Sequence, residues 1–331
     1  QLLMVAGLER YYQIARCYRD EDLRADRQPE FTQLDFEMSF VTEEDVMALT
    51  QSLFCQLGDL VADKLTMNRE FPRITYAESM ERYGTDKPDL RYELHLQDLA
   101  KHALDTDFKV FSEAADNGQR LRGFVVPGGA DTSRKGLDRL TDMAREAGAG
   151  GLVWINFDGE GAIDDITLDE IRSPVARFFS IEEMIALARD AGAKRGDLLL
   201  LAIGEDKLTS RVLDVLRRHV ASERKLTSDE ELYFVFVTEF PMFEWDDTNE
   251  RWSAMHHLFT APFEEDIPLL QSDPGLVRSR AYDLVANGWE LSSGSIRIHS
   301  RDLQERVLLT LGLTLEEARI KFGHMLDAFE F

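Results

Sequence analysis

The chain has 331 residues, of which 44% are hydrophobic and 30% are charged, a composition typical of a globular protein with more than one core. Its formal net charge of −24 argues against a protein that coats nucleic acid nonspecifically, because most of the surface would repel phosphates. The sequence contains no run of 18 apolar residues, so no membrane span is predicted. Its two cysteines, Cys17 and Cys55, do not make a disulfide scaffold, and a reducing, cytoplasmic setting is expected.

Residues 11–40 predict a long β-hairpin whose strands flank a highly charged loop. Alternate residues of a strand share a face. The polar face of the second strand is therefore expected to hold Phe31, Gln33, Asp35, Glu37 and Ser39. The opposite face is expected to pack against a core and holds Thr32, Leu34, Phe36, Met38 and Phe40. Arg19 ends the first strand, and we expect its guanidinium to lie near Phe31.

These side chains suit a charged, flat ligand. A guanidinium binds a phosphate well, an aromatic ring stacks on a base, and a carboxylate receives an ammonium group. The alternative is an ordinary solvated sheet face, which is common in antiparallel sheets.

A helix is predicted from Thr42, where Thr42 and Asp45 form a near capping box, to about Leu65. Apolar residues recur on it at three- and four-residue steps, which predicts a core-facing stripe made of Val46, Leu49, Leu53, Leu57, Leu60 and Val61.

From about residue 95 to 225, predicted strands alternate with predicted helices, which indicates a compact α/β unit. One helix begins at a full capping box, Ser180 to Glu183. The glycines of this region lack the spacing of a nucleotide-binding loop and are expected in turns and at a helix end; they are Gly128, Gly129, Gly148, Gly150 and Gly151. The simplest organisation is an antiparallel domain in two parts, 1–94 and 226–331, interrupted by residues 95–225.

Two further segments carry candidate site residues. "AMHHLFTAP", residues 254–262, places His256 beside His257 without zinc-ligand spacing, and an ordinary surface histidine pair is the alternative. "YDLVANGWELSSGSIRIH", residues 282–299, contains an Asn-Gly hairpin turn flanked by Asp283 and Glu290, and it ends near Arg297. Two carboxylates suit a metal-bound phosphate, and a buried guanidinium suits a carboxylate.

"RDEDLRADRQPEFTQLD", residues 19–35, resembles motif 2 of class II aminoacyl-tRNA synthetases, and residues 1–40 resemble the bacterial-type aspartyl-tRNA synthetases. The histidine segment is similar to the family's "HH-FT-P", and residues 95–225, with "GGAD" at 128–131, resemble its inserted GAD domain. At residues 292–294 the chain has Ser-Ser-Gly where the family often has three glycines. The resemblance covers essentially the whole chain and implies an α+β fold, a class II antiparallel sheet with an inserted α/β GAD-like domain.

The resemblance implies an aspartate–tRNA ligase that uses ATP and Mg²⁺ and charges tRNA(Asp), with tRNA(Asn) left open as a second acceptor. By this resemblance, the catalytic guanidinium is expected to be that of Arg19. The expected ATP-binding residues are Arg19, Asp20, Glu21, Gln28, Phe31 and Glu290. The expected L-aspartate-binding residues are Arg19, Gln33, Asp35, His256, His257 and Arg297. The acceptor end of tRNA is expected to meet Arg24, Asp26 and Arg27, and Mg²⁺ is expected to be held through ATP by Asp283 and Glu290.

We expect an OB-fold anticodon-binding domain, motif 1 and motif 3 to lie outside residues 1–331, a homodimer for the full-length protein, and no activity for this part alone. Two alternatives stay open: a non-catalytic, synthetase-like tRNA-binding paralogue, and an asparaginyl relative. The GAD-like insertion and the context of Arg297 speak against the second.

Overall fold

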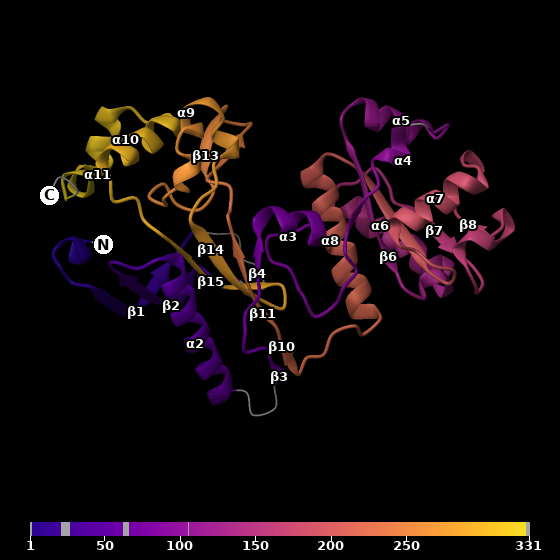
Figure 1. The fold of residues 1–331 in the computed structure, drawn as a ribbon, viewed down its shortest axis with the longest axis horizontal. Helices are drawn as coiled ribbons and strands as arrows, with labels where there is room; N and C mark the ends of the chain where they lie inside the picture. Colours follow the sequence, from indigo (N-terminus) through magenta and orange to yellow (C-terminus); the bar gives the residue numbers. More distant parts are fainter. Residues whose placement is uncertain (1, 21–26, 62–65, 105, 329–331) are drawn as a thin grey trace. The chain divides into compact units, whose positions relative to one another are not determined.

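The computed structural model describes residues 2–20, 27–61, 66–104 and 106–328, and the chain divides into two compact units. Unit 1 comprises Gln1–Tyr76 and Leu232–Phe331, and unit 2 comprises Ala77–Glu231 (Figure 1). Unit 2 is thus wider at both ends than the predicted inserted range 95–225. Among the described helices, none combines the length and the hydropathy that a membrane span requires.

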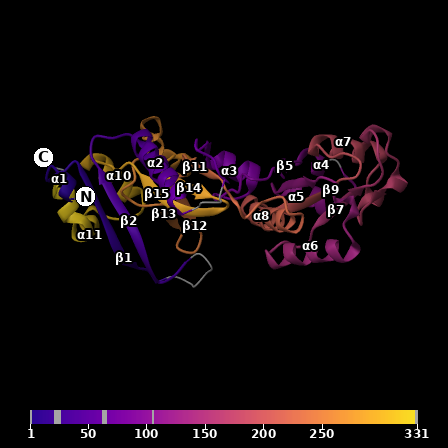
Figure 2. The ribbon, with the colours of Figure 1, turned by 90° about the horizontal axis from the view of Figure 1, so that it is seen from below.

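Unit 1 contains the predicted hairpin. A short helix, α1 (Leu2–Val5), precedes β1 (Arg10–Tyr18), which pairs antiparallel with β2 (Glu30–Met38) along its full length (Figure 2). The antiparallel register is regular and sets Asp35 opposite Gln13. The predicted core face is wrong: Leu34 is 46% exposed and Phe40 is 96% exposed. Among the described strands β1 and β2 pair only with each other, and a lone two-stranded ribbon cannot bury a whole face.

A four-stranded sheet forms the centre of unit 1, in the order β15-β14-β11-β4. Its strands are β4 (Arg73–Thr75), β11 (Phe234–Thr238), β14 (Ala281–Ala286) and β15 (Trp289–Ser295). β4 lies parallel to β11, and the other pairs are antiparallel. The predicted hairpin turn is confirmed, because Asn287 (φ 52°) and Gly288 (φ 85°) join β14 to β15 in the left-handed region that such a turn requires.

Helix α2 (Glu43–Val61) covers one face of this sheet, and its predicted cap is confirmed. The Thr42 amide and hydroxyl both donate to the Asp45 carboxylate at 2.8 Å. The predicted apolar stripe is wrong in phase: Met47 is 3% exposed and packs near Phe236, whereas Leu60 is 78% exposed. Apolar residues occur around much of this helix, so contact with the phenylalanines of the sheet decided which side was buried.

The remaining elements of unit 1 are short strands and helices, and a second core among them includes Phe243, Val277 and Val307. The strands are β3 (Thr66–Met67), β12 (Phe243–Asp246) and β13 (Arg251–Ala254), and β10 (Glu231–Leu232) begins at the end of unit 2. The helices are α9 (Leu269–Ser272), α10 (Arg301–Thr310) and α11 (Leu315–Ala328), with 3-10 turns at Glu264–Asp266 and Pro274–Leu276. α1 lies against α11, so both ends of the described chain belong to one side of the unit.

Unit 2 is a five-stranded sheet in the order β5-β6-β9-β7-β8, and its pairs are antiparallel. Its strands are β5 (Gln97–Asp98), β6 (Arg120–Val126), β7 (Val153–Phe157), β8 (Ile171–Arg172) and β9 (Leu198–Gly204). Its helices are α3 (Tyr76–Tyr83, which begins at the last residue of unit 1), α4 (Lys101–Leu104), α5 (Lys109–Asp116), α6 (Arg134–Glu146), α7 (Ile181–Ala191) and α8 (Asp206–Glu223). The 3-10 turns are Gly129–Asp131, Ile163–Asp165, Leu168–Glu170 and Ala176–Phe178.

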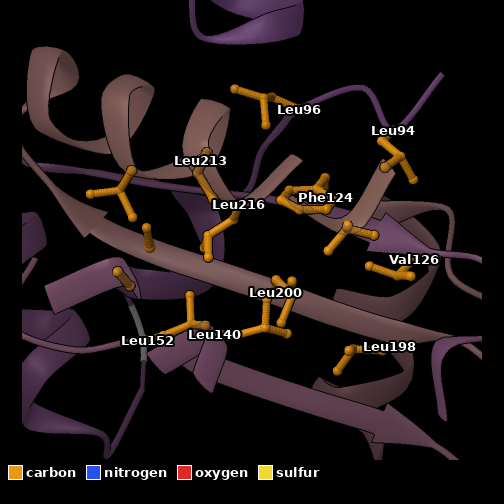
Figure 3. Close-up of a cluster of buried hydrophobic side chains, with 14 of the residues drawn as sticks. Leu94, Leu96, Phe124, Val126, Leu140, Leu152, Leu198, Leu200, Leu213 and Leu216 are labelled. Carbon is orange, nitrogen blue, oxygen red and sulfur yellow. The ribbon is translucent and has the colours of Figure 1, made fainter. Parts of the chain in front are cut away.

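The central strand β9 is buried on both faces. Leu198 and Leu200 join the core under α6 and α8 (Figure 3), whereas Leu199 and Leu201 join the core under α5 and α7. This arrangement explains the continuous leucine run, because a strand covered on both faces needs no polar alternation. The predicted capping box of α7 is also confirmed, since the Ser180 amide and hydroxyl both donate to Glu183.

A buried arginine explains why unit 2 starts earlier than the sequence predicted. Arg217 of α8 is 1% exposed and donates to the backbone carbonyls of Tyr83 (3.1 Å), Glu93 (3.2 Å) and Leu94 (2.6 Å). Its Cζ lies 5.2 Å from the ring centroids of both Tyr83 and Tyr92. These contacts fix residues 83–94 to the helix, so the segment belongs to this unit.

Candidate functional site

The hairpin brings together one group of predicted residues, the hairpin cluster, defined as Arg19, Phe31, Gln33 and Asp35. The Cζ atom of Arg19 lies 5.1 Å from the centroid of the Phe31 ring. Gln13 donates through Nε2 to Asp35 Oδ2 at 3.1 Å, and the Cys17 thiol lies 3.5 Å from Gln33 Oε1. The cluster therefore offers a cation, a ring, an amide and an oriented carboxylate on one face of the two-stranded ribbon.

The charged loop is only partly described. Its base is closed by a hydrogen bond from the Arg19 amide to the Pro29 carbonyl at 2.9 Å. Asp20 and Gln28 are exposed, and Arg27 is half-buried. The other predicted loop residues, Glu21, Arg24 and Asp26, lie outside the described residues.

A second group, the strand cluster, is defined as His256, His257, Asp283, Glu290 and Arg297. A cavity of about 210 Å³ lies beside the histidines, and it is lined by His256, His257, Thr260, Ser293, Gly294 and Ser295. Pockets for drug-sized ligands measure about 300–1,000 Å³. The cavity is thus of a size for a small polar ligand, and its hydroxyl groups suit hydrogen bonding.

Arg297 lies next to this cavity. Thr260, a cavity residue, forms an isolated antiparallel bridge with Arg297, and the Arg297 Cζ atom lies 4.2 Å from the ring centroid of Phe259. Burial lowers the Arg297 pKa to about 10, while the negative charge of Glu37 on β2 opposes that shift. The guanidinium therefore stays charged at neutral pH, in a place that favours its pairing with an anion.

His257 is held by the same loop. Its Nδ1 accepts a hydrogen bond from the Phe259 amide at 3.2 Å, and its ring meets the Phe259 ring at 4.9 Å. Burial of the imidazole and the nearby positive charge of Arg297 both lower the His257 pKa. The imidazole is thus kept neutral, with Nδ1 as an acceptor. His256 packs edge-on against Phe240 at 4.4 Å.

The two acidic residues of the strand cluster lie on paired strands. Asp283 of β14 is buried, and Glu290 of β15 sits opposite Val285, two residues further along β14. Among the described residues, no group of three or more histidine, cysteine, aspartate or glutamate side chains has the arrangement of a metal site. Two carboxylates fit an ion such as Mg²⁺ that takes most of its ligands from phosphate and water.

The structure joins the two clusters through neighbouring residues. The charge of Glu37, which follows Asp35 on the same face of β2, acts on Arg297. Glu43, the first residue of α2, also pairs with Arg280, which directly precedes β14. Phe259 was missed as a site residue by the sequence reasoning, although an aromatic residue two positions after a histidine pair was a visible signal.

The family model "tRNA synthetases class II (D, K and N)" matches residues 1–331. The chain is 47% identical over 332 residues to an "Aspartate--tRNA(Asp/Asn) ligase" of Dehalococcoides mccartyi (strain CBDB1), a match that spans 100% of this chain and 56% of that protein. It is 46% identical over 332 residues to an "Aspartate--tRNA ligase" of Geobacillus kaustophilus (strain HTA426), spanning 100% of this chain and 55% of that protein.

A solved structure, "Aspartyl tRNA synthetase from Entamoeba histolytica", matches with a TM-score of 0.42 and 15% identity, covering 100% of this chain and 42% of that chain. The chain spans about half the length of the curated relatives that it matches.

Proposed function

Because the chain belongs to the class II tRNA synthetases of the D, K and N type, we propose that it carries the substrate-binding residues of an aspartate–tRNA ligase. In the full-length protein, the α-carboxylate of L-aspartate attacks the α-phosphorus of ATP, and pyrophosphate leaves. The terminal ribose hydroxyl of tRNA(Asp) then attacks the aspartyl-adenylate, and AMP leaves. The Dehalococcoides relative also has tRNA(Asn) in its name, so tRNA(Asn) is a second acceptor to be tested.

In the first step the hairpin cluster binds ATP. Arg19 pairs with the α-phosphate and balances the negative charge that grows on it during attack. Phe31 stacks on the adenine, with Arg19 beside it at 5.1 Å. Asp20, Glu21 and Gln28 also bind ATP, from the loop that joins the two strands. Positioning of this kind accelerates a transfer because the reacting groups no longer have to find each other in solution.

L-Aspartate binds between the clusters through its ammonium group and its side-chain carboxylate. Asp35 takes the ammonium group, and the hydrogen bond from Gln13 fixes which carboxylate oxygen points to the ligand. Arg297 pairs with the side-chain carboxylate, with Gln33, His256 and His257 around it. The low pKa of His257 supports this arrangement, since a neutral imidazole does not compete with Arg297 for the carboxylate.

Asp283 and Glu290 would hold Mg²⁺ together with the phosphates of ATP. When bound, the ion supplies positive charge to the departing pyrophosphate. The loop residues Arg24, Asp26 and Arg27 meet the acceptor end of tRNA, where arginines contact phosphates. The full-length protein is a homodimer and works in the cytoplasm.

The observation that supports this proposal best is the stacking of Arg19 on Phe31 beside an oriented Asp35. A guanidinium, a ring and a carboxylate on one ribbon match the phosphate, the base and the ammonium group of an aminoacyl-adenylate.

Charging of tRNA by the purified full-length protein tests the proposal. Radiolabelled L-aspartate should appear on a tRNA(Asp) transcript in the presence of ATP, and a tRNA(Lys) transcript is the control. A parallel reaction with tRNA(Asn) decides the second acceptor. Full-length protein that binds tRNA(Asp) but forms no aspartyl-tRNA would overturn the proposal in favour of a non-catalytic paralogue, and preference for L-asparagine would overturn it in favour of an asparaginyl enzyme.

A further inference from the structure

The ring of Phe259 lies directly against the guanidinium of Arg297, with 4.2 Å between the Cζ atom and the ring centroid. A free arginine side chain samples many rotamers, and its planar guanidinium forms two parallel hydrogen bonds with a carboxylate only in one orientation. Contact with an aromatic face restricts that plane and leaves the N–H edges pointing outward. Phe259 thus fixes the feature of Arg297 on which two-point pairing with a carboxylate depends.

The ring of Phe259 is itself held on several sides. His257 meets it at 4.9 Å with an interplanar angle of 60°, and Phe322 of α11 meets it edge-on at 5.3 Å and 82°. The Phe259 carbonyl accepts the Ile298 amide at 2.8 Å, and the next residue, Thr260, bridges to Arg297. Ring and guanidinium are therefore locked to each other by backbone pairing as well as by stacking.

Resting on the function proposed above, we infer that Phe259 is a specificity-determining positioning residue that aligns the Arg297 guanidinium for the side-chain carboxylate of aspartate. It touches no reacting atom and acts only through Arg297. Its loss should weaken the binding of a ligand with a second carboxylate and should leave ATP and the chemical step largely unaffected. The same loss should reduce the preference for aspartate over asparagine, because an amide cannot accept two parallel N–H bonds from one guanidinium.

Aspartate-dependent ATP–pyrophosphate exchange by the full-length protein tests the inference. For Phe259→Leu we expect the KM for L-aspartate to rise about tenfold, within the range of a partly desolvated cation–π contact. We expect kcat and the KM for ATP to change less than about threefold. Phe259→Tyr keeps the aromatic face and should restore the KM for aspartate to within about twofold of wild type.

Phe322→Leu is the matched control. It removes packing from the edge of the same ring but leaves the ring on Arg297, so the KM for aspartate should change less than about threefold. Circular dichroism and the melting temperature identify any variant that fails to fold, in which case Phe259→Tyr and Phe259→Trp carry the comparison and should keep wild-type values.

The outcomes separate the two proposals. A wild-type protein without aspartate-dependent exchange refutes the proposed function. Exchange by wild type with an unchanged aspartate KM in Phe259→Leu, or with an equal rise in Phe322→Leu, refutes the role of Phe259. A rise in the KM for ATP matching that for aspartate also refutes it, because loosening of the whole site would then explain the loss.

Discussion

The carboxylate of Glu43 forms a two-point ion pair with the guanidinium of Arg280, with Nε–Oε1 and Nη2–Oε2 distances of 2.5 Å. Glu43 begins α2 soon after the hairpin, and the Arg280 carbonyl accepts the Ile296 amide at 3.0 Å. Burial raises the pKa of Glu43, but the hydrogen bonds from Arg280, a backbone hydrogen bond at Glu43 and the charge of Arg280 together outweigh burial and lower the pKa below its usual value. The ion pair therefore links the start of α2, which follows the hairpin, to the residue that directly precedes β14.

Replacing Glu43 by glutamine should lower the free energy of unfolding of unit 1 by about 1–3 kcal/mol at pH 7, the range for a charged hydrogen-bonded pair that is not fully buried. Because the folded-state pKa of Glu43 is lowered, the stabilisation is present above about pH 4.5 and is lost as the pH falls through the folded-state value. Urea unfolding, followed by tryptophan fluorescence, measures the difference between wild type and Glu43→Gln. A difference that does not shrink below pH 4.5 would contradict this account.

Two substitutions on α2 test which side of the helix is buried. Met47→Ala should cost about 2–4 kcal/mol of unfolding free energy, because Met47 is 3% exposed and its loss leaves a cavity against Phe236. Leu60→Ala should cost less than about 0.5 kcal/mol, since Leu60 is 78% exposed. Equal losses of unfolding free energy for the two variants, or a larger loss for Leu60→Ala, would contradict the observed burial of Met47 and support the predicted stripe.

Local signals predicted the hairpin, the Asn287-Gly288 turn and both capping boxes, because each depends on residues close in the chain. Burial was predicted less well. Alternation separated the two faces of β2 correctly, but it could not tell that Leu34 and Phe40 would be exposed, since that depends on what covers the ribbon. On α2 the apolar residues are compatible with more than one core-facing stripe. Packing against phenylalanines of strands distant in the sequence determines which side of the helix is buried.

The N-terminal boundary of unit 2 depends on a buried arginine, a feature that sequence patterns rarely reveal. Arginine is usually exposed, so nothing in the sequence indicated that Arg217 would hold residues 83–94. Within the site, the pairing of Arg19 with Phe31 followed from strand geometry. The place of Phe259 under Arg297 did not, because the two residues are almost 40 positions apart in the sequence and lie outside the named strands.

Arg217→Ala should destabilise unit 2 by about 3–5 kcal/mol, because three backbone carbonyls lose their donor in a buried place. Native-state hydrogen exchange should report faster exchange for the amides of β6 and β9. Arg134→Ala, which removes only the exposed ion pair with Asp138, is the control and should change exchange little. Unchanged protection of β6 and β9 in Arg217→Ala would refute the role of this arginine.

The imidazole of His257 should titrate below its ordinary pKa of 6.5 in the folded protein. The unfolded chain then binds the proton at a higher pH than the folded chain, so stability contributed by this group is present above pH 6.5 and falls as the pH drops through the folded-state pKa. Histidine ring signals in an NMR titration, assigned by their loss in His257→Gln, provide the measurement. A midpoint at or above 6.5 would mean that packing on Phe259 and the charge of Arg297 do not act as described.

Aspartate-dependent ATP–pyrophosphate exchange by the full-length protein, compared with its Arg19→Met variant, tests the central proposal most directly. The account predicts exchange with L-aspartate and a fall in kcat of about a hundredfold or more in Arg19→Met, because a charged contact to the α-phosphate is lost in the transition state. Exchange by Arg19→Met at the wild-type rate, or no exchange by the wild-type protein, would contradict it.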